Sequence, residues 1–455
     1  MKITELSAIT PTDGRYANQV SDLQEIFSEY ALIKYRVSVE IKWFIHLSNQ
    51  AGIKELPTLK PSSIKFLNNI IEKFNLTEAN KVKKIEKKIN HDVKAVEYYL
   101  KKQFHNSREL NSLSEFIHFG CTSEDINNIS YALMVKDASN IITSKKLKEL
   151  NNLIKSKAKR YSNISMISRT HGQLATPTTV GKEFANFSYR IDGVVDQISS
   201  QKLKGKMNGA VGNYNAHIIA YPKLNWERVS KNFVNKLGLE WSAYTTQVEP
   251  KDHMVGLFLN FFILNNILID LSRDLWGYIS LDYFSQETLK GEVGSSTMPH
   301  KVNPIDFENA EGNLGIANSL FLHMSSKITI SRWQRDLSDS TTMRNIGACF
   351  AHTQIALISL TKGLNKIEVN KKKINYDLKE SWEVLTEAIQ TVMRKHRITE
   401  GYEEMKKASR GKRITKDDLH SMINGLDIPK TEKELLLKIT PSNYIGLAKK
   451  LAKEI

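Results

Sequence analysis

Residues 257–264 read Leu257-Phe258-Leu259-Asn260-Phe261-Phe262-Ile263-Leu264, and they form the centre of a run, 252–280, that is apolar on most of its surface. A helix that is apolar all round is surrounded by other helices or by lipid. The charge-free part, 254–269, contains Asn260, Asn265 and Asn266 and is shorter than the roughly 20 residues that a membrane helix needs. The run therefore predicts the central helix of a bundle and no membrane association.

The rest of the chain also favours helices. Apolar residues recur at three- and four-residue spacing in the segments 30–47, 63–74, 93–104, 125–157 and 382–396. A short β-like run lies near 165–168, but no alternation of strand and helix units follows it. These patterns predict an all-α fold with a long central helical bundle.

Three helical domains are expected from changes along the chain. Residues 1–111 hold shorter helices and a turn-rich start, and residues 112–364 hold the longest helices and most of the unusual loops. Residues 365–455 are rich in lysine and are broken near Gly411 and Pro429. A chain of 455 residues is long enough for several such units.

Composition limits the class of protein. Two isolated cysteines, Cys121 and Cys349, form no disulfide framework or zinc site, and the N-terminus carries no secretory signal, so a cytoplasmic location is expected. The net charge of +16 is spread over lysine runs that are interrupted by apolar residues, which is typical of solvated helix faces. No aromatic residues interleave with these runs and no nucleic-acid motif is present, so we expect no nucleic-acid partner. A positive field still favours the approach of an anionic small molecule.

One loop carries most of the chemistry. Residues 294–304 read Gly294-Ser295-Ser296-Thr297-Met298-Pro299-His300-Lys301-Val302-Asn303-Pro304. Glycine and two prolines prevent a helix there, and the loop presents hydroxyls, a cation and an amide. With Gly291 just upstream, it has the composition of a mobile lid; the alternative is a plain connector between helices.

Polar islands elsewhere add to this loop, whereas phosphate-loop, dinucleotide-binding, zinc-protease and CxxC motifs are absent from the sequence. The islands lie at 14–16, 90–92, 118–125, 169–173, 208–213, 245–250 and 332–344. Each has an ordinary explanation: residues 122–125 are a helix start, and Arg335 and Arg344 are surface residues paired with Asp336 or Asp339. Seven islands together favour a catalytic site. On chemical grounds alone, Ser295, His91 or His171 is a candidate for the base.

The loop at 294–304 resembles the signature loop of the fumarase/aspartase superfamily, whose members eliminate fumarate from succinyl-type substrates. Within that superfamily, the segments around His118, His171 and His300 resemble those of the adenylosuccinate lyases, bacterial subgroup. The similarity runs essentially from end to end, and no motif position departs from the pattern.

The resemblance implies a role for each residue. Ser295 matches the general base and His171 the general acid, with the serine alkoxide stabilised by loop amides and Lys301. Further positions match substrate-binding residues of the family, with the arginines suited to phosphate: Arg15, Tyr16, Asn90, His91, Asp92, Thr122, Ser123, Gln247, Ser296, Lys301, Asn303, Asn309, Arg335, Ser340 and Arg344.

The resemblance also implies a homotetramer whose active sites draw on several subunits, succinylated purine nucleotides as small-molecule substrates, and no metal or organic cofactor. The rivals are another superfamily member such as an argininosuccinate lyase, a non-catalytic protein that keeps the fold, and a basic nucleic-acid binder.

Overall fold

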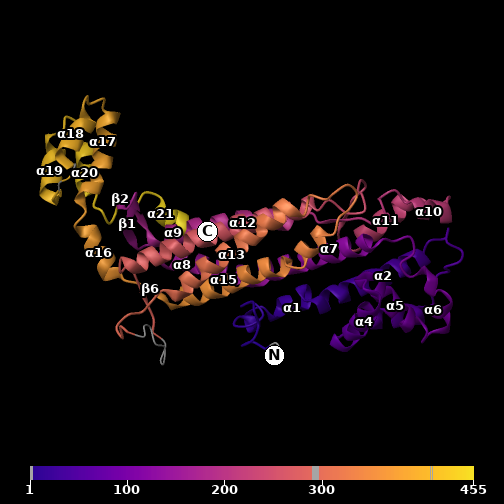
Figure 1. The fold of residues 1–455 in the computed structure, drawn as a ribbon. Coiled ribbons are helices and arrows are strands. Elements are labelled where there is room, and N and C mark those ends of the chain that lie inside the picture. The colour runs from indigo at the N-terminus through magenta and orange to yellow at the C-terminus, as the bar shows by residue number, and fades with distance from the viewer. Residues whose placement is uncertain (1–3, 289–296, 410, 412) are drawn as a thin grey trace. The chain divides into compact units, whose positions relative to one another are not determined.

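The computed structural model describes residues 4–288, 297–409, 411 and 413–455. Its elements are mostly helices, as predicted (Figure 1). The first part of the chain contains η1 (Ala17–Gln19), α1 (Ser21–Phe27), α2 (Glu29–Ser48), α3 (Pro61–Glu72), α4 (Leu76–Ile89), α5 (Asp92–Phe104), α6 (Arg108–Ser112) and η2 (Ser114–Phe116).

The middle part contains the longest helices. They and their connections are α7 (Ser123–Ile141), the π-helical segment Ile142–Leu147, α8 (Lys148–Arg160), β1 (Ser165–Thr170), β2 (Gln173–Thr179), α9 (Val180–Ser200), β3 (Lys204–Gly205), α10 (Asn215–Ala220), α11 (Trp226–Lys236), β4 (Glu240–Trp241), α12 (Asp252–Ser280), β5 (Phe284–Gln286), α13 (Ile305–Lys327), α14 (Ser338–Met343) and α15 (Ile346–Lys366).

The last part is built from β6 (Ile367–Val369), α16 (Lys371–Lys379), η4 (Trp382–Leu385), α17 (Thr386–Lys395), α18 (Gly401–Ser409), α19 (Lys416–Gly425), α20 (Lys430–Lys438) and α21 (Ala448–Glu454). The strands pair only two at a time: β1 with β2 and β5 with β6 are antiparallel, and β3 with β4 is parallel. The β-like run near 165–168 is therefore confirmed as part of β1.

The chain divides into two compact units. The first unit comprises Met1–Lys146, Val194–Asn266 and Gly312–Ile358, and the second comprises Leu147–Gly193, Ile267–Glu311 and Ser359–Ile455. In the first unit α2 packs against α4, α5 and α7, and in the second α17, α18, α19 and α20 form one group (Figure 1). The division into three domains at 111 and 364 stays a prediction.

An aromatic cluster forms part of the core of the first unit. The fully buried rings of Phe258 and Phe261 on α12 pack against Phe321 on α13 and Phe350 on α15, with ring centroids 5.0–6.4 Å apart. Each buried ring contributes about 2 kcal/mol to the free energy of unfolding. The apolar pattern of 257–264 thus packs against neighbouring helices, as predicted.

The asparagines of α12 are explained by buried partners. Asn265 Nδ2 donates to Asn318 Oδ1 at 3.0 Å and to Thr353 Oγ1 at 3.3 Å, and Asn318 Nδ2 donates to Asn266 Oδ1 at 2.9 Å. By length and composition alone α12 is long and apolar enough to cross a membrane, and half of its most apolar stretch is buried within the protein. Buried amides that bond to neighbouring helices fit the predicted bundle helix.

Candidate active site

Two arginines hold Asp92 at the start of α5. Arg36 of α2 donates from Nη2 to Asp92 Oδ2 at 2.8 Å, and Arg344 Nη2 lies 3.0 Å from the same oxygen. Burial alone would raise the pKa of Asp92, but the charges of the two arginines and hydrogen bonds outweigh burial and hold the pKa below its usual value. Asp92 is therefore a carboxylate fixed in place.

Arg335 is anchored in a similar way. Its Nη1 donates to Gln247 Oε1 at 3.1 Å, and its Nη2 lies 3.2 Å from Oε1 of the buried Glu124. Asn127, one turn along α7, donates to the same Glu124 oxygen and accepts from Arg36 Nε. These contacts form one continuous polar network, which we call the arginine network. Its members are Arg36, Asp92, Glu124, Asn127, Gln247, Arg335 and Arg344.

The expected pairing of the two arginines with Asp336 or Asp339 is wrong. Asp336 pairs with Arg332, and Asp339 pairs with the buried Lys251. Arg335 and Arg344 instead contact residues 88 or more positions away in the chain. Both arginines therefore bond to polar residues that are distant in the sequence, which makes them candidates for a binding site.

A buried ion pair supports the segment at 208–213. Asp125 and Lys206 are both fully buried, with Lys206 Nζ 3.1 Å from Asp125 Oδ1 and 3.0 Å from the carbonyl of Gly209. Asp125 also accepts from the backbone amides of Thr122 and Asn208. Gly209 takes a φ of +86°, which favours glycine.

The same segment reaches Gln247. Asn208 Nδ2 donates to Thr245 Oγ1 at 2.8 Å, and Gln247 Nε2 donates to the carbonyl of Ala210 at 3.0 Å. Gly212 approaches Thr245 so closely that a β-carbon would lie 2.4 Å from the Thr245 carbonyl oxygen. The loop at 208–213, to which the sequence assigned no role, therefore links Asp125 to Gln247.

Thr122 and Ser123 stand at the start of α7, as predicted. Thr122 is the N-cap in a capping box with Asp125, so its backbone amide and Asp125 fix the first turn.

Asn90 and His91 stand where α4 ends and α5 begins. Asn90 caps α4 in the left-handed conformation, which asparagine tolerates, and His91 Nδ1 accepts from the amide of Lys94 at 3.1 Å. This capping role argues against Nδ1 of His91 as a base.

A cavity of about 230 Å³ lies next to Arg344. Its wall includes Thr10, Thr12, Asp13 and Ser28, and these first residues lead directly to Arg15 and Tyr16. Arg15 is exposed, with its guanidinium carbon 5.9 Å from the centre of the Tyr16 ring. Ser340 lies on α14, one turn before Arg344.

In the second unit, His171 occupies the tip of the β1–β2 hairpin. His171 and Gly172 have φ values of +52° and +74°, and Thr170 pairs with Gln173 across the turn. Two successive positive φ values are typical of the type I′ turns that join twisted antiparallel strands. The imidazole is exposed and makes no hydrogen bond to the part of the chain that the structure describes.

Lys301, Asn303 and Asn309 also belong to the second unit. Lys301 is exposed, Asn303 is half-buried, and Asn309 Oδ1 accepts from Ser359 Oγ at 2.8 Å. Val302 accepts from Gln286 Nε2 at 3.1 Å, which ties this segment to β5. Ser295 and Ser296 lie outside the described residues, so their predicted roles stay predictions.

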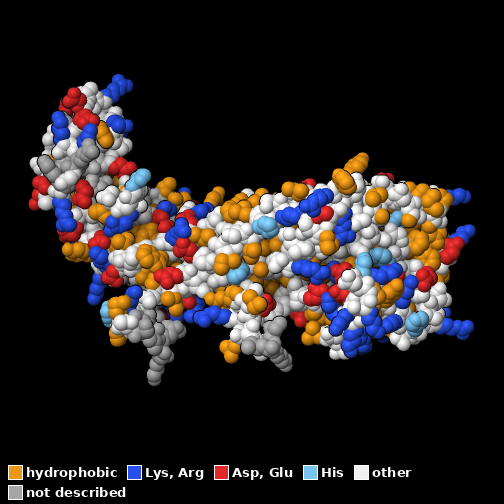
Figure 2. All heavy atoms as spheres, viewed as in Figure 1, with side chains coloured by type: hydrophobic (Ala, Val, Ile, Leu, Met, Phe, Trp, Pro, Cys, Tyr) orange, Lys and Arg blue, Asp and Glu red, His pale blue; other side chains and the backbone are white. Residues whose placement is uncertain are grey.

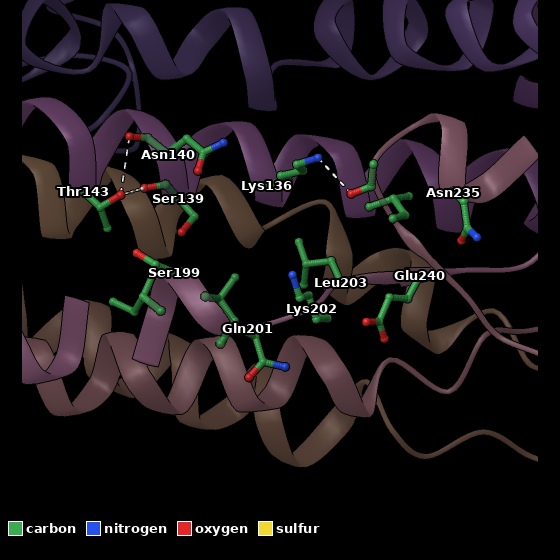
Figure 3. Close-up of a pocket in the computed structure, with 14 residues that line it drawn as sticks. Lys136, Ser139, Asn140, Thr143, Ser199, Gln201, Lys202, Leu203, Asn235 and Glu240 are labelled. Atoms are coloured by element: carbon green, nitrogen blue, oxygen red, sulfur yellow. Dashed lines mark hydrogen bonds between the residues drawn. The ribbon is translucent and has the colours of Figure 1, made fainter. Parts of the chain in front are cut away.

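A larger cavity, about 540 Å³, lies elsewhere in the first unit (Figure 3). Lys136, Ser139 and Asn140 of α7 line one side of it, and Lys136 Nζ donates to the carbonyl of Gly238 at 2.9 Å. The residues that line it include no predicted site residue. The arginine network, rather than this cavity, is the candidate site.

Sequence reasoning missed Arg36, Glu124 and Asn127 as members of the site. Arg36 was the most detectable, because it is a charged residue within the apolar pattern of 30–47. Its side chain is 1% exposed, and a buried arginine requires partners.

Within the residues that the structure describes, no group of three or more His, Cys, Asp or Glu side chains is arranged to hold a metal. The need for no cofactor stays a prediction.

Comparison with known proteins defines the class first. Residues 14–317 match the lyase family, and residues 331–445 match the adenylosuccinate lyase C-terminal family. The fold is similar to a fumarate lyase from Mesorhizobium sp. BNC1, with a TM-score of 0.74, 17% identity and coverage of 95% of this chain and 97% of that one. It is also similar to β-carboxy-cis,cis-muconate cycloisomerase from Acinetobacter calcoaceticus, with a TM-score of 0.70, 18% identity and coverage of 97% and 99%. The chain is thus an enzyme of the lyase class with the fold of the fumarate lyases.

Full-length relatives narrow the class. The chain is 52% identical to adenylosuccinate lyase of Buchnera aphidicola subsp. Schizaphis graminum and 50% identical to adenylosuccinate lyase of Escherichia coli K12, over 100% of both chains in each case. The chain belongs to the adenylosuccinate lyase family, which confirms the resemblance seen in its motifs.

Proposed function

We propose that the chain eliminates fumarate from adenylosuccinate, giving AMP, and from succinylaminoimidazole carboxamide ribotide, giving the corresponding carboxamide ribotide. The observation that carries this proposal is the arginine network, because Arg344 lines a cavity beside the turn that leads to Arg15 and Tyr16. Guanidinium groups form bidentate hydrogen bonds with phosphate oxygens, and a nucleotide substrate supplies such a phosphate.

The reaction breaks a C–H bond and a C–N bond and forms a C=C bond. Ser295 takes the proton from the carbon next to a carboxylate, and His171 gives a proton to the departing nitrogen. Lys301, Asn303 and Ser296 hold the succinyl carboxylates and stabilise the negative charge that develops, while Thr122, Ser123 and Gln247 contact the same part of the substrate. The imidazole of His171 is exposed and makes no hydrogen bond to the described residues, which suits a group that must exchange protons with a substrate.

We also infer a homotetramer in which several copies contribute to each active site. Four large apolar side chains on the long helices of the first unit are 40–49% exposed: Leu259 and Ile263 on α12, and Ile316 and Leu322 on α13. Apolar side chains on long helices favour association of copies. Two free cysteines, Cys121 and Cys349, support the expected cytoplasmic location, and neither a membrane nor nucleic acid is proposed as a partner.

The test is an assay of the purified protein with adenylosuccinate, following AMP and fumarate, with argininosuccinate in a parallel reaction. We expect products from adenylosuccinate alone. Fumarate from argininosuccinate alone would assign the chain to the rival activity, and no product from either would contradict an enzymatic role.

A variant tests the phosphate site itself. Arg344→Ala should raise KM for adenylosuccinate about 10- to 100-fold, because a hydrogen bond to a charged group is lost. The matched control is Arg332→Ala, since Arg332 is 82% exposed and pairs with its close neighbour Asp336. Equal KM values for the two variants would contradict the phosphate role of Arg344.

A further inference from the structure

Glu29 forms an ion pair with Arg344, the residue whose guanidinium the proposed function assigns to phosphate binding. Glu29 is the first residue of α2, and its Oε2 lies 2.6 Å from Arg344 Nη1. The other terminal nitrogen, Nη2, lies 3.0 Å from Asp92. Both terminal nitrogens of Arg344 are therefore engaged, and a phosphate that binds Arg344 through both competes with these carboxylates for the guanidinium.

The burial of the two carboxylates indicates which of them a phosphate displaces from Arg344 more easily. Asp92 is 28% exposed and is shared with Arg36, whose side chain is 1% exposed, so displacing Asp92 would disturb a buried pair. Glu29 and Arg344 are 41% and 38% exposed, and an ion pair between exposed groups contributes little. A bidentate arginine–phosphate contact is stronger than such a pair. Glu29 is thus the partner that phosphate replaces.

Lys83 on α4 is a second cationic partner for the Glu29 carboxylate. Its Nζ lies 3.3 Å from Glu29 Oε1 and 2.7 Å from Glu86 Oε2. Burial lowers the pKa of Lys83, but the contacts with Glu86 and Glu29 outweigh burial and raise it, so the ammonium stays charged. Lys81, Lys84, Lys87 and Lys88 lie on the same helix, and Figure 2 shows basic side chains gathered over it. Glu29 can leave Arg344 without becoming unpaired.

The cavity of about 230 Å³ gives a phosphate access to Arg344. Ser28, the N-cap of α2, and Arg344 both line this cavity, and Glu29, the next residue, contacts Arg344 Nη1. A phosphate that reaches Arg344 from this cavity would compete with the Glu29 carboxylate for the same guanidinium. The affinity for phosphate is then set by competition between two anions for one arginine.

We propose that Glu29 is a specificity-determining residue that occupies Arg344 in place of a phosphate monoester, and that Lys83 keeps its ion pair with Glu29 when the phosphate binds. This inference rests on the proposed phosphate role of Arg344. Glu29 accordingly weakens the binding of substrate, whereas Lys83 strengthens it by drawing Glu29 away from Arg344.

The first test is the variant Glu29→Gln. We expect KM for adenylosuccinate to fall roughly three- to tenfold, and inhibition by inorganic phosphate to tighten by a similar factor, because a competing anion is removed. The matched control is Glu25→Gln on α1, which changes the same charge four residues earlier at an exposed position. The control should leave both values unchanged. An unchanged or higher KM for Glu29→Gln, with wild-type circular dichroism and thermal unfolding, would overturn the proposal.

The second test uses Lys83→Met. Without Lys83, the Glu29 carboxylate stays closer to Arg344, so KM should rise, and in a Glu29→Gln background the same substitution should have no effect. An equal rise in both backgrounds would overturn the exchange between Arg344 and Lys83. Wild-type protein in the same assay separates the two proposals: absence of wild-type turnover contradicts the proposed function, whereas wild-type turnover with an unchanged Glu29→Gln variant contradicts only the role of Glu29.

Discussion

The two units present their predicted site residues in different ways. In the first unit, Asp92, Gln247, Arg335 and Arg344 are joined by ion pairs and hydrogen bonds that reach the buried side chains of Arg36 and Glu124. In the second unit, His171 projects from a hairpin turn and Lys301 is exposed. The difference teaches that polar partners fix these residues of the first unit before substrate arrives, whereas His171 and Lys301 of the second unit are exposed.

The largest expected effect is on proton transfer by the second unit. His171→Ala should lower kcat about 10²- to 10⁴-fold, the usual contribution of a general acid, with little change in KM. Because the side chain is exposed, the free energy of unfolding should stay at the wild-type value. Steady-state kinetics and denaturant unfolding check both statements. A kcat near the wild-type value would place the acid elsewhere.

The next effect concerns the rigidity of the first unit. Lys206→Met leaves the buried Asp125 carboxylate without its cation, and breaking such a pair costs about 3–5 kcal/mol of unfolding free energy. KM should rise as well, because the loop at 208–213 and Thr122 lose a common anchor. Denaturant unfolding and steady-state kinetics measure the two effects.

A matched variant separates anchoring from general destabilisation. Lys157 is also buried, lies in the second unit and donates to the backbone carbonyl of Ile367 at 3.2 Å. Lys157→Met should lower stability without raising KM. If both lysine variants raised KM equally, the ion pair would have no specific role in positioning Thr122 and Gln247.

The smallest effect is a pH dependence of stability in the first unit. Burial lowers the pKa of His118, but Glu40, whose Oε1 lies 2.6 Å from His118 Nδ1, outweighs burial and raises it. The stabilisation is therefore fully present below the unfolded pKa of about 6.5 and is lost as pH rises through the higher folded pKa. Its size is about 1.4 kcal/mol for each unit by which the pKa is raised.

Comparing wild type with His118→Gln in denaturant at a series of pH values measures this contribution. The difference in unfolding free energy should shrink as the pH rises. A difference that stayed constant or grew would mean that the protonated histidine is not what Glu40 stabilises.

Local features of the fold were predictable from sequence. The apolar run around Phe258 and Phe261 predicted the helix 252–280, and residues 122–125 predicted the start of α7, because periodicity and capping depend on neighbours in the chain. The family motifs then indicated His171 and the arginines.

Long-range partners were not predictable in the same way. Arg36 bonds to Asp92, 56 residues away, and Arg344 reaches Glu29, 315 residues away. Spacing within a segment carries no information about such contacts. For Arg335 and Arg344 it suggested nearby aspartates instead, which bond to Arg332 and Lys251.

The most direct test of the account is complementation between two impaired variants. Arg344→Ala removes a binding residue of the first unit and His171→Ala a proton donor of the second, so a tetramer with shared sites that contains both kinds of chain holds some sites with neither defect. The two variants are unfolded together, refolded as a mixture and assayed with adenylosuccinate at a concentration below the wild-type KM, beside each variant refolded alone. We predict that the mixture is more active than either variant alone. A mixture that forms tetramers yet is no more active than its components would contradict an active site shared between copies.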